Sequence, residues 1–189
     1  MIRRALVTGF EPFGENAANP SAELALSLDG ETAGGLHIAG RVLPVEYGTS
    51  GDLLLGWIRD LRPERVICCG LASASRAIRV ESIAFNLDDS PFPDNAGVVR
   101  ENARICATAP DSLPATLPVE RVITECSERG IPVDSSIDAG RYVCNHVFFR
   151  LMNEVLEARL PIAAGFIHLP PDLPLAVMRE ALHIALSTE

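Results

Sequence analysis

Short apolar runs alternate with segments of helical periodicity along this chain. The runs are rich in β-branched residues and are bounded by Gly, Pro or polar clusters, which predicts strands. The predicted strands are Ala5–Thr8, Ile38–Val45, Arg65–Cys69, Ile78–Asn86, Val133–Ile137 and Ile162–His168. Apolar positions three and four residues apart predict helices over Pro20–Leu28, Ser50–Leu61, Val119–Arg129, Val143–Arg159 and Leu175–Ser187.

Strands that alternate with helices are typical of an α/β fold with a largely parallel sheet. The first helix has a readable start, because Asn19 can cap it and Pro20 suits its first position. The stretch from Leu87 to Pro118 is rich in proline and has no clear period, which predicts a long loop of the kind that often forms a lid. No boundary or repeat divides the chain, so we expect one domain over residues 1–189.

Composition narrows the class of ligand. The 189 residues carry a formal charge of −9, and the chain has no basic run. This argues against nucleic-acid binding and favours a small molecule or a modest peptide. No apolar stretch approaches the roughly 20 residues of a membrane span, and the N-terminus lacks the apolar core of a secretory signal. We therefore expect a cytoplasmic protein that does not contact membranes.

The five cysteines are odd in number and lack metal-ligand spacing, which suits a reducing compartment. Cys68 and Cys69 lie in an apolar run, and Cys126 shares the apolar face of a predicted helix, so we expect all three to be core residues. Cys106 lies in the Pro- and Ala-rich segment and stays ambiguous. Cys144 alone stands at a predicted strand-to-helix junction beside Gly140 and the polar Asn145.

Cys144 is the strongest candidate nucleophile. The first turn of a helix offers free backbone N–H groups and the positive end of the helix dipole, which stabilise a thiolate. A histidine nearby can take the thiol proton and return it to a leaving group. The other interpretation is a small buried hydrophobe, which is what most free cysteines are.

His168 is the best partner among the histidines. It ends an apolar strand, and open α/β sheets place ligands at the carboxyl ends of their strands. His146 is nearer in sequence, but residues two apart on a helix do not face each other. His183 shares a polar helix face, and His37 has no obvious companion. A hydrogen-bonded strand-end histidine without catalytic role remains the alternative for His168.

Two further features have open interpretations. Alternation along Ile78–Asn86 places Arg79, Glu81, Ile83 and Phe85 on one face. Glu81 can therefore orient a catalytic imidazole, or it can simply pair with Arg79, and spacing alone slightly favours the ion pair. Phe10 and Phe13 lie in a predicted surface turn that lacks a phosphate-binding pattern. They can be residues that fill the core, or they can form an apolar clamp for a flat, uncharged ring.

Several segments together closely resemble pyroglutamyl peptidase I, the pyrrolidone-carboxylate peptidase family of cysteine peptidases. They occur in family order and at family-like spacing over nearly the whole chain. The matching segments are Val7–Gly14 with Asn19-Pro20-Ser21, Glu81 with Ala84 and Asn86, Pro93-Asp94-Asn95 with Gly97, Ala139-Gly140 with Tyr142–Asn145, and Gly165–His168.

The resemblance implies a three-layer α/β/α sandwich and removal of N-terminal pyroglutamate (5-oxoproline) from peptides through a thioester. It implies Cys144 as nucleophile, His168 as base and acid, and Glu81 as the residue that orients the imidazole. It further implies that Phe10 and Phe13 line the ring and that Asn19 helps to fix the site, with backbone groups near Leu71 and Val143 as lactam partners. Neither metal nor cofactor is expected, and family members are commonly dimers or tetramers.

The chain departs from the family pattern in places. The segment Gly70–Arg76 lacks two of the usual glycines and a glutamine, and Pro91 replaces a usual arginine. The stretch Ala107–Ser112 lacks the expected Gly-Pro-x-x-Tyr, and the segment after His168 is short. These changes leave two alternatives beside a pyroglutamyl peptidase: a thiol amidase or acyl-transfer enzyme of altered specificity, and a pyroglutamyl-binding protein without turnover.

Overall fold

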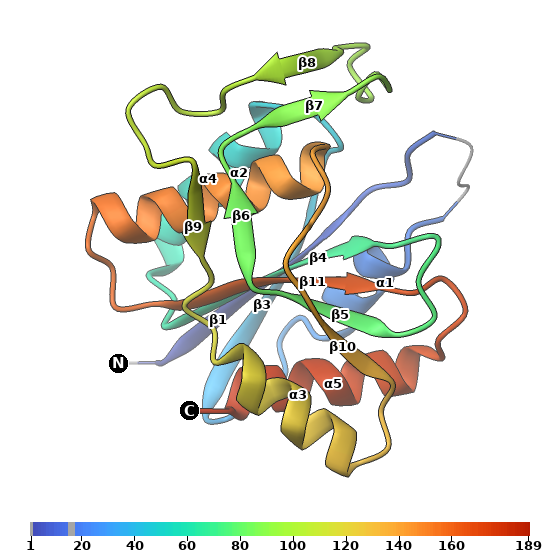
Figure 1. The fold of residues 1–189 in the computed structure, drawn as a ribbon. Helices are drawn as coiled ribbons and strands as arrows, with labels where there is room; N and C mark the ends of the chain where they lie inside the picture. Colours follow the sequence, from blue (N-terminus) through green and yellow to red (C-terminus); the bar gives the residue numbers. More distant parts are fainter. Residues whose placement is uncertain (1, 15–17) are drawn as a thin grey trace.

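The computed structural model describes residues 2–14 and 18–189 (Figure 1). A central sheet contains the strands β1 (Arg4–Phe10), β2 (Thr32–Ala33), β3 (Leu36–Leu43), β4 (Arg65–Leu71), β5 (Ile78–Glu81), β10 (Val133–Ser136) and β11 (Ala163–Leu169). Their order across the sheet is β10-β5-β11-β4-β1-β3-β2. The pairs β5–β11 and β2–β3 are antiparallel and the other neighbours are parallel, so the sheet is mixed and largely parallel.

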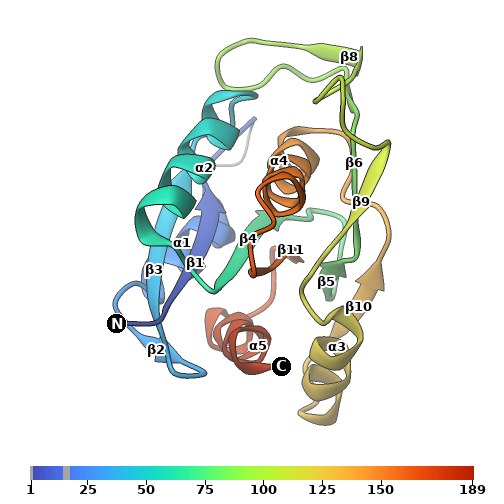
Figure 2. The same ribbon diagram turned by 90° about the vertical axis from the view of Figure 1, so that its left-hand side faces the viewer.

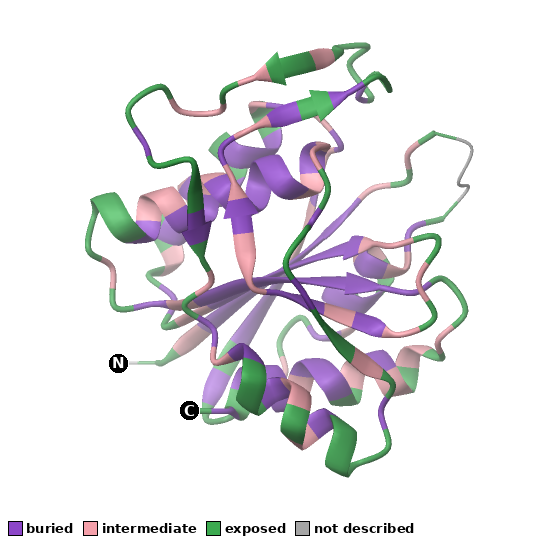
Figure 3. Ribbon diagram, in the orientation of Figure 1, coloured by how far each residue is buried: buried purple, intermediate pink, exposed green. Residues whose placement is uncertain are grey.

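Helices cover both faces of this sheet, which gives the three-layer α/β/α sandwich (Figures 1 and 2). The helices are α1 (Pro20–Ser27), α2 (Thr49–Leu61), α3 (Val119–Glu128), α4 (Val143–Glu157) and α5 (Leu175–Ser187). Apolar residues of α1, α3 and α5 share one core cluster with the sheet, and those of α2 and α4 share the other. The central strands are buried on both faces because a helix layer lies on each (Figure 3).

The fold and most predicted elements are confirmed, with ends that differ by up to two residues. Asn19 caps α1 as predicted, since its side chain accepts a hydrogen bond from the Ser21 N–H at 3.1 Å. Cys68, Cys69 and Cys126 are fully buried core residues, also as predicted. No helix among the described residues is both long and apolar enough to cross a membrane.

The prediction of one strand over Ile78–Asn86 is wrong. The chain leaves the main sheet at Ser82, whose N–H and Oγ both donate to the Ser136 carbonyl, at 2.7 and 2.9 Å. It then forms β6 (Ile83–Phe85), which pairs with β9 (Ser112–Pro114) in a separate small sheet. Arg79 and Glu81 therefore do not continue the face of Ile83 and Phe85. Alternation along the sequence does not reveal a strand that changes sheets.

The prediction of an unstructured loop over residues 87–118 is wrong as well. Besides β9, this stretch forms an antiparallel hairpin of β7 (Asp88–Ser90) and β8 (Arg100–Ala103), which lies beyond α2 and α4 at the top of Figure 1. These strands are short and polar. They are held by polar contacts, such as those of Asp88 with His146 and Arg100, and have no apolar face. Their sequences therefore lack the alternation of apolar and polar residues that predicts a strand.

Candidate active site

A buried carboxylate–histidine pair lies at one end of the central sheet. Glu81 ends β5 and His168 lies near the end of the neighbouring β11, where the antiparallel pairing of the strands brings the two together. The Glu81 Oε1 lies 2.8 Å from His168 Nδ1, and the Glu81 side chain is fully buried. A carboxylate at Nδ1 stabilises the tautomer with the proton on Nδ1. The lone pair of Nε2 is then free to accept a proton.

Arg79 also contacts this pair. Its Nε lies 3.7 Å from Glu81 Oε1, and its Nη2 donates to Ser136 Oγ at 2.5 Å. The two interpretations of Glu81 are thus not exclusive, because one carboxylate oxygen faces both the imidazole and the guanidinium. The Arg79 contact, at 3.7 Å, is longer than the 2.8 Å contact with His168, so the imidazole is the nearer partner of the buried carboxylate.

Cys144 lies at the start of α4, close to the histidine strand. Gly70 of β4 pairs with His168, and a Cβ on Gly70 would lie 2.9 Å from the Cys144 sulfur. The missing side chain of Gly70 therefore makes the space for the sulfur. No side chain caps α4, so backbone N–H groups of its first turn stay available to an anion beside the sulfur.

Burial has a larger effect on the pKa of the Cys144 thiol than the helix start has. Burial first, and the nearby Glu81 carboxylate second, together raise the pKa of Cys144 to about 12. The expected stabilisation of a thiolate by the helix start is outweighed in the resting protein. The thiol is therefore neutral near pH 7 and needs a base at the moment of attack.

A small, tight cavity opens next to Cys144, with a volume of about 10 Å³. It is lined by Phe10, Phe13, Asn19, Val45, Leu71, Tyr142, Val143 and Cys144. All five residues predicted to bind substrate are among them. The lining is almost entirely apolar, and Asn19 uses its side chain to hold Glu11 O, at 3.1 Å, and Ser21. Such a lining suits a neutral group rather than an ion.

The cavity lies where the sheet topology predicts a ligand. Phe10 ends β1 and Leu71 ends β4, and the chain passes from β1 to β3 on one side before it returns to β4 on the other. The carboxyl ends of strands at such a reversal border a crevice. Phe10 is buried, and Phe13 is partly buried with its ring centroid 6.1 Å from that of Tyr142, so neither is a free surface residue.

The remaining histidines do not join this site. His183 is partly exposed and lies 3.4 Å from Glu31, and His37 is exposed on β3, between β1 and β2. His146 is buried and contacts Asp88 instead. Within the described residues, no three His, Cys, Asp or Glu side chains gather as a ligand set for a metal ion.

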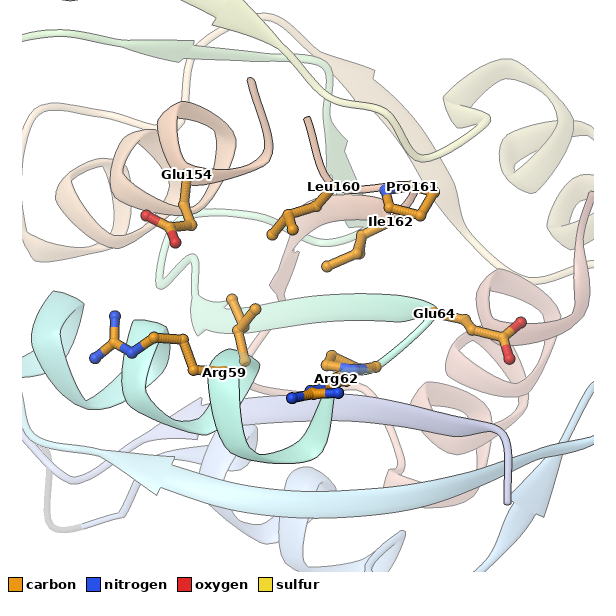
Figure 4. A pocket seen from close by; sticks show the side chains of 9 residues that line it. Arg59, Arg62, Glu64, Glu154, Leu160, Pro161 and Ile162 are labelled. Atoms are coloured by element: carbon orange, nitrogen blue, oxygen red, sulfur yellow. The ribbon is translucent and has the colours of Figure 1, made fainter. Parts of the chain in front are cut away.

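A larger cavity lies at the opposite end of the strands (Figure 4). Its lining includes Pro63 and Ile162, which precede β4 and β11, together with the outward-directed Arg59 and Glu154. It contains no cysteine or histidine. Nothing there matches the chemistry of the Cys144 cavity.

Comparison with known proteins agrees with this geometry. A family model described as pyroglutamyl peptidase matches residues 3–186.

The chain belongs to the pyroglutamyl peptidase family.

Among curated family members, the pyrrolidone-carboxylate peptidase of Chromobacterium violaceum is 43% identical over 169 residues, which cover 89% of this chain and 78% of that protein. The Pyrococcus furiosus pyrrolidone-carboxylate peptidase is 39% identical over 167 residues, 88% of this chain and 80% of its own length. The crystal structure of pyroglutamyl peptidase I from Bacillus amyloliquefaciens superposes with a TM-score of 0.95 at 32% identity, over 100% of this chain and 97% of that one.

The sequence analysis did not identify three residues of the site in this pyroglutamyl peptidase family member. Val45 and Tyr142 line the cavity, and Gly70 makes room for the sulfur. Val45 follows β3, so the rule that ligands bind beyond the carboxyl ends of strands points to it. Tyr142 adjoins Val143 in a matching segment. Gly70 gave no signal, because its role depends on a contact between two elements far apart in sequence.

Proposed function

We propose that this protein is a cysteine peptidase that removes N-terminal pyroglutamate from peptides. One observation carries the proposal: the Cys144 sulfur borders a small apolar cavity and also lies beside Gly70, the residue of β4 that pairs with His168, whose imidazole contacts Glu81. The resemblance of the whole chain to pyroglutamyl peptidases supports the same activity.

Attack begins with transfer of the Cys144 proton to His168 Nε2 as the sulfur bonds to the pyroglutamyl carbonyl carbon. The raised thiol pKa favours this coupled transfer over a preformed ion pair. Glu81 holds the imidazole through Nδ1 and stabilises the imidazolium that forms. The developing oxyanion accepts hydrogen bonds from N–H groups at the start of α4.

The tetrahedral intermediate collapses when His168 returns the proton to the leaving amine and the C–N bond breaks. A thioester between pyroglutamate and Cys144 remains. His168 then takes a proton from water, the hydroxyl adds to the thioester, and the sulfur leaves with the proton from His168. The products are the shortened peptide and free pyroglutamate, and the enzyme returns to its starting state without metal or cofactor.

Recognition of the ring rests on the cavity. The 5-oxoproline ring is flat and neutral, so apolar walls from Phe10, Phe13 and Leu71 suit it. We propose that backbone groups near Leu71 and Val143 bond the lactam, and that Asn19 fixes the loop that carries Phe13.

The test is release of a fluorescent amine from a pyroglutamyl amide and from its prolyl analogue under reducing conditions. The prolyl ring has a similar shape but lacks the lactam carbonyl and carries a protonated nitrogen. We expect turnover of the pyroglutamyl compound alone. Equal turnover of both would refute lactam recognition. Turnover of neither, with Cys144 still alkylated, would favour the acyl-transfer enzyme of altered specificity.

The proposal also includes a cellular location and an oligomeric state. All five cysteines lie in the described residues and are free thiols, which supports a cytoplasmic protein. Family resemblance supports a homodimer or homotetramer. Analytical ultracentrifugation measures the assembly directly, and a monomer at micromolar concentration would contradict it.

A further inference from the structure

A second buried histidine–carboxylate pair includes His146, which lies two residues after the nucleophile on α4. His146 Nδ1 is 2.8 Å from Asp88 Oδ2, and both side chains are almost fully buried. Arg100 Nη1 donates to the same oxygen at 3.1 Å. Neither the catalytic step nor the cavity lining uses these residues.

The second pair differs from Glu81–His168 in one decisive way. The Gly48 N–H donates to His146 Nε2 at 3.3 Å, so this nitrogen serves as an acceptor. Asp88 Oδ2 then accepts a hydrogen bond from Nδ1–H, which assigns the proton of the imidazole to Nδ1. With both nitrogens occupied, His146 cannot serve as a proton acceptor for a thiol. Its two hydrogen bonds instead connect separate segments of the chain.

His146 joins three parts of the chain. It lies on α4 two residues after Cys144, Asp88 begins the β7–β8 hairpin, and Gly48 precedes α2. Arg100 on β8 closes the arrangement, with its guanidinium carbon 5.0 Å from the centre of the Tyr47 ring. Tyr47 in turn packs edge-on against His146, with ring centroids 5.6 Å apart.

The turn at the other end of the hairpin contacts three walls of the cavity. Tyr142 donates its O–H to the Pro93 carbonyl at 2.9 Å. The Asn95 N–H donates to the Val45 carbonyl at 2.9 Å, and the Asn95 side chain donates to Glu11 Oε1 at 2.7 Å. The contacted segments supply Tyr142, Val45 and Phe13 to the cavity. A shift at the base of the hairpin therefore reaches the ring pocket through this turn.

We propose that His146 is a positioning residue for the pyroglutamyl ring: with Asp88 and Arg100 it fixes the hairpin whose turn holds the pocket walls. The inference rests on the proposed peptidase activity. It assigns His146 to ring binding and leaves the chemical step to Cys144, His168 and Glu81.

The test compares His146→Phe, which keeps a ring but loses both nitrogens, with His183→Phe on the outer face of α5 as the matched control. The readouts are KM and kcat for a pyroglutamyl amide, the inhibition constant of 2-pyrrolidone as the ring alone, and the rate of Cys144 alkylation by iodoacetamide. We expect KM and the inhibition constant to rise about tenfold in His146→Phe, because the pocket walls are no longer held in place. A tenfold change is of the size expected for the net contribution of about one hydrogen bond. The kcat and the alkylation rate should stay within about threefold. The control should match the wild type.

A folded His146→Phe variant with wild-type KM and inhibition constant would overturn the positioning role, and so would a loss confined to kcat. Should His146→Phe fail to fold, Tyr142→Phe decides, because it removes only the contact with Pro93 and keeps the ring. The proposal expects a weaker rise of KM and of the inhibition constant there, and unchanged values would overturn it. A wild type without pyroglutamyl turnover would refute the proposed function itself, which separates the two failures.

Discussion

Substitution of Gly70 by alanine places a methyl group directly against the nucleophile. The new Cβ would lie 2.9 Å from Cys144 Sγ and 3.0 Å from Phe166 Cζ. Ordinary contact between such atoms begins near ~3.5 Å, so the sulfur or the ring must move by about 0.5 Å or more. Phe166 packs against Phe10, Phe148 and His168, with ring centroids 4.8 to 6.4 Å apart, and has little room to yield. We expect the sulfur to move.

The cost follows from the geometry of attack. A displacement of about 1 Å at reacting groups costs up to ~100-fold in rate. We therefore expect kcat/KM of Gly70→Ala to fall about 10- to 100-fold, or roughly 1.4 to 2.7 kcal/mol of transition-state stabilisation. Overpacking should also lower the free energy of unfolding by about 1 to 3 kcal/mol. The protein should remain folded at 25 °C.

The matched control is Gly165→Ala on the neighbouring strand β11. Its Cβ would lie 3.0 Å from Leu117 Cβ, an equally tight contact that does not involve the sulfur. The assay measures kcat/KM on a pyroglutamyl amide beside the melting temperature of both variants. Both should lose stability, but only Gly70→Ala should lose a large part of its activity. Wild-type kcat/KM in Gly70→Ala, or equal losses in the two variants, would refute the reasoning.

Three other predictions test neighbouring parts of the account. Glu81→Gln should lower kcat about 100- to 10,000-fold, because an amide can hold His168 in the wrong tautomer, while the melting temperature changes little; unchanged turnover would make the carboxylate purely structural. With the Cys144 pKa raised to about 12, its alkylation by iodoacetamide should keep rising by roughly tenfold per pH unit from pH 7 to 10, and a plateau below pH 9 would indicate a preformed thiolate. Asn145→Ala should lower the free energy of unfolding in urea by about 2 to 4 kcal/mol, because the buried amide bonds the Phe85 N–H and two carbonyls; a loss under ~0.5 kcal/mol would contradict this.

The regular elements could be predicted because each shows its apolar face in local sequence. The helix Leu175–Ser187 has the predicted ends, and the strand that carries His168 differs by one residue at each end. The same logic placed Cys144 at a helix start and His168 at a strand end. Proximity of the two was then a consequence of the parallel sheet.

The parts that escaped prediction depend on contacts between distant segments. Ser82 ends β5 through bonds to Ser136, and no local pattern announces that partner. The β7–β8 hairpin is held by buried polar contacts, of which His146–Asp88 is one, rather than by an apolar face. The state of the thiol also needed the structure, because the helix start and burial act on its pKa in opposite directions.

The central claim is that pyroglutamyl turnover runs through Cys144. The most direct test is turnover of a pyroglutamyl amide by Cys144→Ala, with the melting temperature and the circular dichroism spectrum compared with those of the wild type. The account predicts a folded variant whose kcat/KM falls by at least about a thousandfold, since the loss of a nucleophile removes the covalent path. A folded variant that keeps wild-type turnover would contradict it.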